Sequence, residues 1–130
     1  MILYWVFAYK GITSKLNFIE YNQRDFMRII DCLFAKYGVE NIDCEIVLHD
    51  CDNPEFYNNK INLSTHKSLV YFQQIDFQFA HELTHAIQFA KGEIEIKRYN
   101  DNEPCELEAR KNARYVMHDL LGYKDYGIAV

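Results

Sequence analysis

The chain has 130 residues, a net charge of −5, and 49% hydrophobic and 25% charged residues. These values predict one soluble globular domain over residues 1–130. The low content of proline and glycine, two and five residues, excludes a disordered or collagen-like chain. The mild acidity, without a basic run, argues against a nucleic-acid partner bound through phosphate contacts.

The apolar N-terminal run Met1–Tyr9 is too short for a membrane helix and has no preceding basic residue, so it predicts a buried strand rather than a signal peptide. We therefore expect a cytoplasmic protein without a membrane partner. In such a compartment the four cysteines are expected to be reduced, mostly buried thiols. The cysteines are Cys32, Cys44, Cys51 and Cys105. Because no two of them form a CxxC pair, a four-thiolate zinc site is disfavoured.

The remaining elements follow from apolar residues at helical or alternating spacing and from glycines placed just after helix ends. In chain order they are a helix over 17–37, a strand over 42–49, a polar turn over 51–59, a strand over 60–64, a helix over 68–91, an extended stretch over 94–98, a turn over 100–104 and a helix over 106–121. The tail 123–130 is left unassigned. This order predicts an α+β fold in which helices cover one face of a small sheet.

The chemistry is concentrated in the sequence His81-Glu82-Leu83-Thr84-His85, an HExxH motif inside the long predicted helix. Residues four apart lie on one face of a helix, so His81 and His85 can direct two imidazoles at one metal ion. Glu82 lies about 100° around the helix and can take a proton from a metal-activated water without ligating the ion. Apolar neighbours surround the motif, which predicts a core helix whose histidines need polar partners.

A catalytic zinc site needs a third protein ligand and an open fourth position. The helix that begins near Pro104 offers Glu103, Glu106 and Glu108. Glu106 and Glu108 point about 200° apart, so they cannot both ligate. Negative charge also favours a helix N-terminus by itself, so an acidic first turn has a purely structural explanation as well.

An HExxH helix followed by a glutamate-bearing helix resembles the gluzincin clan of zinc metallopeptidases, whose second motif often reads Glu-x-x-Ala-Asp. The stretch Glu106-Leu107-Glu108-Ala109 matches its first four positions, while Arg110 stands in place of the aspartate. The resemblance covers roughly residues 42–121, and the short chain is similar to minimal zincin-like and ImmA/IrrE-type domains. It implies Zn²⁺ bound by His81, His85 and Glu106. In that clan the aspartate often orients a metal-binding histidine, and in this chain Glu103, Asp101 or a backbone carbonyl could take its place.

The resemblance further implies hydrolysis of peptide bonds in an intracellular protein or peptide. Zinc lowers the pKa of a water towards ~7, and Glu82 acts as the general base. An edge strand over 56–64 would bind extended substrate by strand addition. Tyr99 is the better candidate for a donor to the oxyanion than Tyr115 or His118, which point away from Glu106 on an ideal helix.

Two other interpretations remain open. The same site could bind metal in a catalytically inactive regulatory or partner-binding module, or two helices could carry the motif by chance. The histidines outside the motif, His49 and His66, are expected to be structural, and the 49–52 region is expected to be a polar turn rather than a second metal cluster. The tail 123–130 could cover the cleft, although ordinary packing also explains it.

Overall fold

The computed structural model describes residues 5–15, 19–49, 54–64, 74–95, 97 and 99–122. The strands are β1 (Phe7–Tyr9), β2 (Ile12–Ser14), β3 (Cys44–His49), β4 (Glu55–Tyr57) and β5 (Lys60–Ser64). The helices are α1 (Ile19–Tyr37), α2 (Ile75–Ala90) and α3 (Pro104–Tyr115), which continues into the π-helical turn η2 (Val116–Leu120). The protein is therefore α+β, as the sequence predicts.

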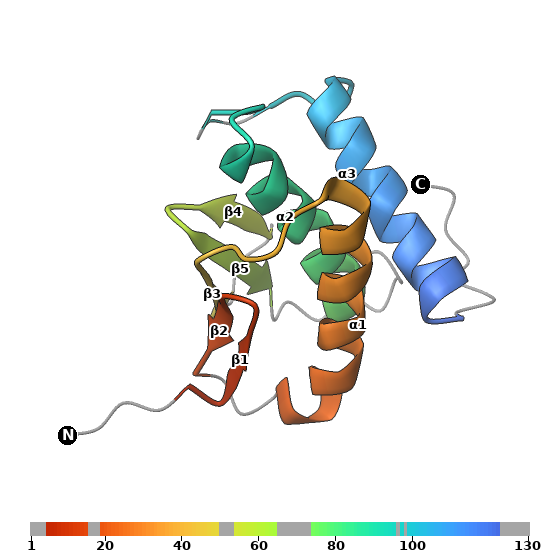
Figure 1. Ribbon diagram of the computed structural model, residues 1–130. Helices are drawn as coiled ribbons and strands as arrows, with labels where there is room; N and C mark the ends of the chain where they lie inside the picture. Colours follow the sequence, from red (N-terminus) through yellow and green to blue (C-terminus); the bar gives the residue numbers. More distant parts are fainter. Residues whose placement is uncertain are drawn as a thin grey trace.

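The five strands form one mixed sheet in the order β1-β2-β3-β5-β4 (Figure 1). The central pairs β2–β3 and β3–β5 are parallel, while β1 and β4 run antiparallel to β2 and β5 at the two edges. Parallel neighbours need a crossover, and α1 provides it between β2 and β3.

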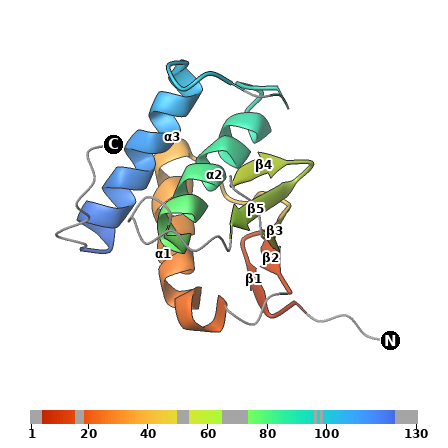
Figure 2. The same cartoon turned by 180° about the vertical axis from the view of Figure 1, so that it is seen from behind.

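The helices lie on one face of this sheet. In Figures 1 and 2 α1 and α2 separate the strands from α3, which packs on the far side of α2. The predicted arrangement, a sheet covered by helices on one face, is confirmed for the described residues. The layer between the sheet and α3 must therefore be apolar on two sides, which explains why α2 carries apolar residues around most of its circumference.

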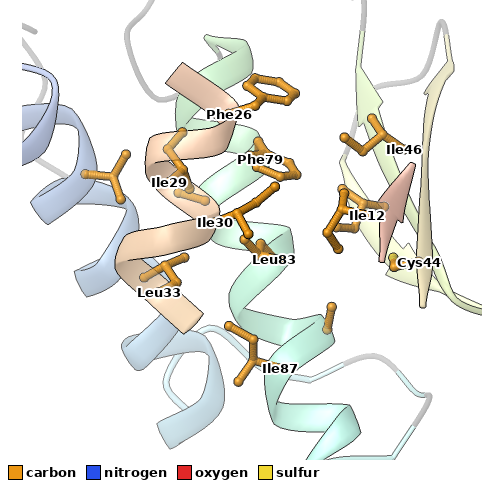
Figure 3. Close-up of a cluster of buried hydrophobic side chains, with 14 of the residues drawn as sticks. Ile12, Phe26, Ile29, Ile30, Leu33, Cys44, Ile46, Phe79, Leu83 and Ile87 are labelled. Atoms are coloured by element: carbon orange, nitrogen blue, oxygen red, sulfur yellow. The ribbon is translucent and has the colours of Figure 1, made fainter. Parts of the chain in front are cut away.

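The core lies between the sheet and the α1–α2 layer (Figure 3). Phe26 of α1 stacks on Phe79 of α2 with ring centroids 4.2 Å apart, and Ile46 of β3 is buried opposite them. Leu83, inside the HExxH motif, is fully buried in the same cluster. Packing of this kind fixes the rotation of α2, and with it the direction of the two motif histidines.

The N-terminal apolar run ends in a tight β1–β2 hairpin rather than continuing as one strand. Gly11 at the turn has φ +90°, and a Cβ there would lie 2.2 Å from the Ile42 carbonyl oxygen. Only glycine allows this close backbone approach. Within the described part of the chain, the strand predicted from the N-terminal apolar run is thus limited to Phe7–Tyr9. The second strand of the hairpin, β2, whose Ile12 is fully buried, was not predicted from the sequence.

The prediction of a polar turn over 51–59 was wrong for its second half, where β4 forms. β4 and β5 are joined by a two-residue turn, Asn58 and Asn59, both at positive φ (51° and 59°). Asparagine tolerates this left-handed region, and the turn type suits a two-residue hairpin. The predicted edge strand over 56–64 is therefore a hairpin, and its outer strand, β4, forms the sheet edge.

Helix α2 begins at Ile75, because Gln74 has an extended backbone, and so starts later than the predicted residue 68. Residues 65–73 lie outside the described part, as do Cys51 and the tail 123–130. The described residues 93–95 form no strand. Among the described cysteines all three are free thiols, with Cys44 buried and Cys32 and Cys105 half-buried. No helix in the described ranges is long and apolar enough to cross a membrane.

Candidate metal centre

Helix α2 holds the two motif histidines on the face that meets α3. The rings of His81 and His85 lie 5.0 Å apart in an edge-to-face arrangement, one helical turn from each other. His85 is buried, and His81 is half-buried at the wall of a cavity. The spacing of the motif therefore brings two imidazoles to one point, as predicted.

The loop over 91–103 reverses the chain, so the first turn of α3 lies beside the last turns of α2 (Figure 1). This brings the Glu106 carboxylate to both histidines: Oε1 lies 3.5 Å from His81 Nε2, and Oε2 makes a closer contact with His85 Nε2. The three ligand atoms lie within 4.8 Å of one another, and no other described group of three such residues is placed in this way.

The structure separates the three glutamates that the sequence left open. Glu103 accepts a hydrogen bond from the backbone N–H of Asn100 (2.8 Å) and so closes the turn before α3. Glu108 faces the other way, towards Tyr37, whose hydroxyl donates to it at 2.7 Å. Only Glu106 faces the histidines.

Glu82 is buried, with 5% of its surface exposed, and its Oε2 lies 3.9 Å from His81 Nε2. Burial raises the pKa of this carboxyl group above its ordinary value, although His81 and His85 oppose that shift. A carboxylate that lies beside the ligand atoms but does not join them, and whose pKa is raised, has the properties of a general base.

Glu106 and His85 interact as a close pair. Burial raises the pKa of Glu106, but hydrogen bonds from His81 and His85 outweigh it and hold that pKa well below its ordinary value. Burial lowers the pKa of His85, but its contacts with Glu106, Glu82 and Gln88 outweigh this and raise it overall. Both shifts favour a carboxylate beside a protonated imidazole, so a metal ion would compete with the proton at Nε2.

A cavity of about 450 Å³ opens beside these residues. Its lining includes Glu55, Phe56 and Tyr57 of the edge strand, and Ile94 and Tyr99 of the connection between α2 and α3. The ring of Phe56 packs on Phe89 of α2, with centroids 5.7 Å apart, which fixes the edge strand against the helix. The cleft is therefore bounded by a β-edge, a helix and a loop.

Of the three candidate oxyanion donors, only Tyr99 lines this cavity. Its hydroxyl oxygen accepts a hydrogen bond from the backbone N–H of Glu95 at 2.9 Å, which leaves the hydroxyl proton available to a bound group. Tyr115 is 49% exposed, and His118 is exposed with Nδ1 3.1 Å from Asp119; neither lines the cavity.

Gln88 was not among the residues predicted from the sequence, yet its side-chain oxygen lies 2.8 Å from His85 Nδ1. Its position three residues after His85 could have indicated the same helix face, but nothing in the local sequence shows what lies opposite. None of the expected substitutes for the family aspartate touches a histidine. Instead Arg110 donates to the Asp101 carbonyl in the loop. The side chains of His49 and His66 lie outside the described residues.

The donor set fits a zinc ion in number and type. Two imidazole nitrogens and one carboxylate oxygen leave a fourth position open, and ligands at about 2.0–2.2 Å from a tetrahedral ion lie roughly 3.3 Å apart. The distance between His81 Nε2 and Glu106 Oε1, 3.5 Å, is close to that separation, whereas the contact between His85 Nε2 and Glu106 Oε2 is shorter and would have to widen to admit an ion. The same donors also accept other divalent ions, so the ligand set by itself does not identify the metal.

No family model, curated protein or solved structure matches the chain. The functional argument therefore depends on the geometry of the site and on the motif.

Proposed function

We propose that the protein is a zinc-dependent metallopeptidase with a zincin-like fold of the gluzincin type. The observation that carries the proposal is the convergence of His81, His85 and Glu106 within 4.8 Å, with the Glu82 carboxylate beside them, on the wall of a cavity. A structural pair of helices has no need for an acid next to two histidines that already have a carboxylate partner.

In this proposal His81, His85 and Glu106 hold the ion. Bound zinc supplies Lewis-acid chemistry, lowering the pKa of a water and polarising the peptide carbonyl. Glu82 accepts the proton of the attacking water and later delivers it to the departing amine. The raised pKa of Glu82 suits both steps, because burial makes this carboxylate a stronger proton acceptor than an exposed glutamate.

The substrate would be an extended peptide of an intracellular protein. Among the described strands β4 is the outermost on its side of the sheet, and its residues line the cavity, where an extended peptide would add as a further strand. Tyr99 lines the same cavity, and in this proposal its hydroxyl donates to the carbonyl oxygen as charge develops there.

The first experiment measures zinc stoichiometry and Kd for the purified protein beside His81→Ala and Glu82→Gln. We expect one zinc per chain in the wild type, loss or strong weakening in His81→Ala, and near-normal binding in Glu82→Gln, because Glu82 does not ligate. Absence of zinc from the reconstituted wild type would refute the proposal and leave a helix pair with a fortuitous motif.

The second experiment measures cleavage of fluorescein-labelled casein by the zinc-loaded wild type and Glu82→Gln. Loss of a general base typically slows a reaction by about 10²–10⁴-fold. Cleavage that persists in Glu82→Gln would reject Glu82 as the base. Full zinc binding without cleavage of any protein or peptide tested would instead favour a metal-binding regulatory module.

A further inference from the structure

We infer that Gln88 is the positioning residue of the metal site: its amide holds His85 with Nδ1 protonated and Nε2 turned towards Glu106. This inference rests on the proposed metal site but concerns a residue outside both sequence motifs. It assigns to Gln88 the orienting role that the resemblance gives to an aspartate at position 110, where this chain has Arg110.

The hydrogen bonds around Gln88 determine which way its amide points. The Gln88 nitrogen lies 2.7 Å from Glu108 Oε1 and 3.1 Å from the Cys105 carbonyl oxygen. A carboxylate and a carbonyl can only accept, so these two contacts use both amide hydrogens. The Gln88 oxygen must then be the atom that faces His85 Nδ1, at 2.8 Å.

This orientation determines the tautomer of the histidine. An amide oxygen has no hydrogen to donate, so His85 Nδ1 must carry one and donate it. In a neutral imidazole the other nitrogen, Nε2, then has a free lone pair, and Nε2 is the atom that meets Glu106. Metal-bound histidines commonly donate their second N–H in this way, which fixes the ring and strengthens the ligand.

The orientation of Gln88 is itself held from the protein interior. The second oxygen of Glu108 accepts from the Tyr37 hydroxyl at 2.7 Å. The Tyr37 oxygen in turn accepts from Asn112 at 2.7 Å, and Asn112 also donates to Thr84 at 3.1 Å. Each donor in this chain meets an acceptor, so reversing any one group would leave two acceptors facing each other.

The network connects all three helices to the metal site. Tyr37 ends α1, Glu108 and Asn112 lie on α3, and Gln88 lies on α2. Gln88 and Asn112 are each 1% exposed, so water cannot easily replace a lost partner. Burial raises the pKa of Tyr37 to about 12, which keeps its hydroxyl protonated and able to donate at any physiological pH.

The test compares zinc Kd, measured by competition with a chromophoric chelator, for Gln88→Leu and Gln78→Leu. Gln78 is a matched control because it is buried on the same helix and hydrogen-bonds the backbone of Ser64, and it is not among the described partners of His81 or His85. We expect Gln88→Leu to weaken zinc by about 10–100-fold, the usual effect of losing a partner of a metal ligand. Gln78→Leu should lower thermal stability and leave the zinc Kd close to wild type.

An exchange of the two side chains gives a second readout. Gln88→Glu alone places two carboxylates against each other and should weaken zinc. Adding Glu108→Gln restores a donor between positions 108 and 88 and keeps an acceptor for His85 Nδ1 and for Tyr37. Because the Cys105 carbonyl still lacks its donor, the double variant should regain part of the affinity. Nitrogen-15 NMR of the zinc-loaded wild type should show the proton on His85 Nδ1.

The outcomes separate this inference from the proposed function. A wild type that binds no zinc removes both. A wild type that binds zinc, with Gln88→Leu equally tight, overturns the role of Gln88 alone. Equal weakening in Gln78→Leu also overturns it, because the effect would then be general destabilisation. If Gln88→Leu does not fold, the double variant Gln88→Glu/Glu108→Gln provides the test instead. The role of Gln88 is then overturned if the double variant binds zinc no more tightly than Gln88→Glu alone.

Discussion

Helices α2 and α3 lie side by side, yet they differ greatly in burial. Twelve of the 16 residues of α2 are buried, including Glu82, His85 and Gln88, whereas only three of the 12 residues of α3 are. Polar groups in α2 must therefore find partners inside the protein, while most of those in α3 can be solvated. A polar residue in the buried helix α2 therefore predicts a polar partner inside the protein. A polar residue in the more exposed helix α3 predicts none, and its role has to be read from its contacts in the structure.

The largest expected effect is on zinc affinity, and it tests which glutamate at the start of α3 is a metal ligand. Glu106→Ala should raise the zinc Kd by more than about 100-fold, beyond what the loss of an indirect partner does, because a ligand is removed. Glu103→Ala is the matched control, since its carboxylate only caps the Asn100 N–H. Chelator competition on both variants measures the effect; similar losses in the two would mean that general acidity, not ligation, sets the affinity.

The next effect compares one leucine from each helix. Leu83 of α2 is fully buried, whereas Leu107 of α3 is 51% exposed. Leu83→Ala should lower the free energy of unfolding by about 2–5 kcal/mol, because it leaves a cavity in the core. Leu107→Ala should change it by no more than about 0.5 kcal/mol. Urea unfolding measures both, and equal losses would contradict the described burial.

A smaller effect is expected at the polar interface between the helices. Tyr37→Phe removes the hydroxyl that donates to Glu108 and accepts from Asn112, so the free energy of unfolding should fall by about 1–3 kcal/mol. Tyr115→Phe, on the exposed side of α3, should have little effect. If thermal unfolding of the two variants agreed, the network would contribute nothing to stability.

The smallest effect is the pH dependence of the metal-free protein, measured in chelator by urea unfolding at pH 5.5 and pH 8. The pKa of His85 is raised by Glu106 and its neighbours, so its stabilisation is complete below its unfolded value of 6.5 and is lost as pH rises through the folded value. Burial raises the pKa of Glu82, which also destabilises the folded state as pH rises.

The lowered pKa of Glu106 contributes stability above its unfolded value of 4.5 and loses it only in stronger acid, so this group does not change between pH 5.5 and pH 8. The protein should therefore be more stable at pH 5.5 than at pH 8. Glu82→Gln should reduce the difference. Greater stability at pH 8 would contradict both pKa shifts.

The fold was predictable where its pattern is local. The helix over 17–37, the strand over 60–64 and the α+β class follow from spacing and agree with α1 and β5. The edge strand β4 was missed because a segment of three residues is too short to show the alternation of apolar and polar residues that marks a strand. It is a strand because it pairs with β5. The late start of α2 was missed because helical spacing does not show where tertiary packing begins.

The sequence by itself determined the arrangement of His81, Glu82 and His85, because these residues share one helix and helical geometry is local. It could not decide among Glu103, Glu106 and Glu108 without a resemblance. For Gln88 it indicated only a helix face shared with His85, not the partners that lie opposite. Only the tertiary structure decided these points, because the antiparallel packing of α3 on α2 brings together residues that are 20 or more positions apart in the chain. Helix α2 thus carries two of the candidate ligands and the candidate base, while the third candidate ligand reaches the site only because α3 packs against α2.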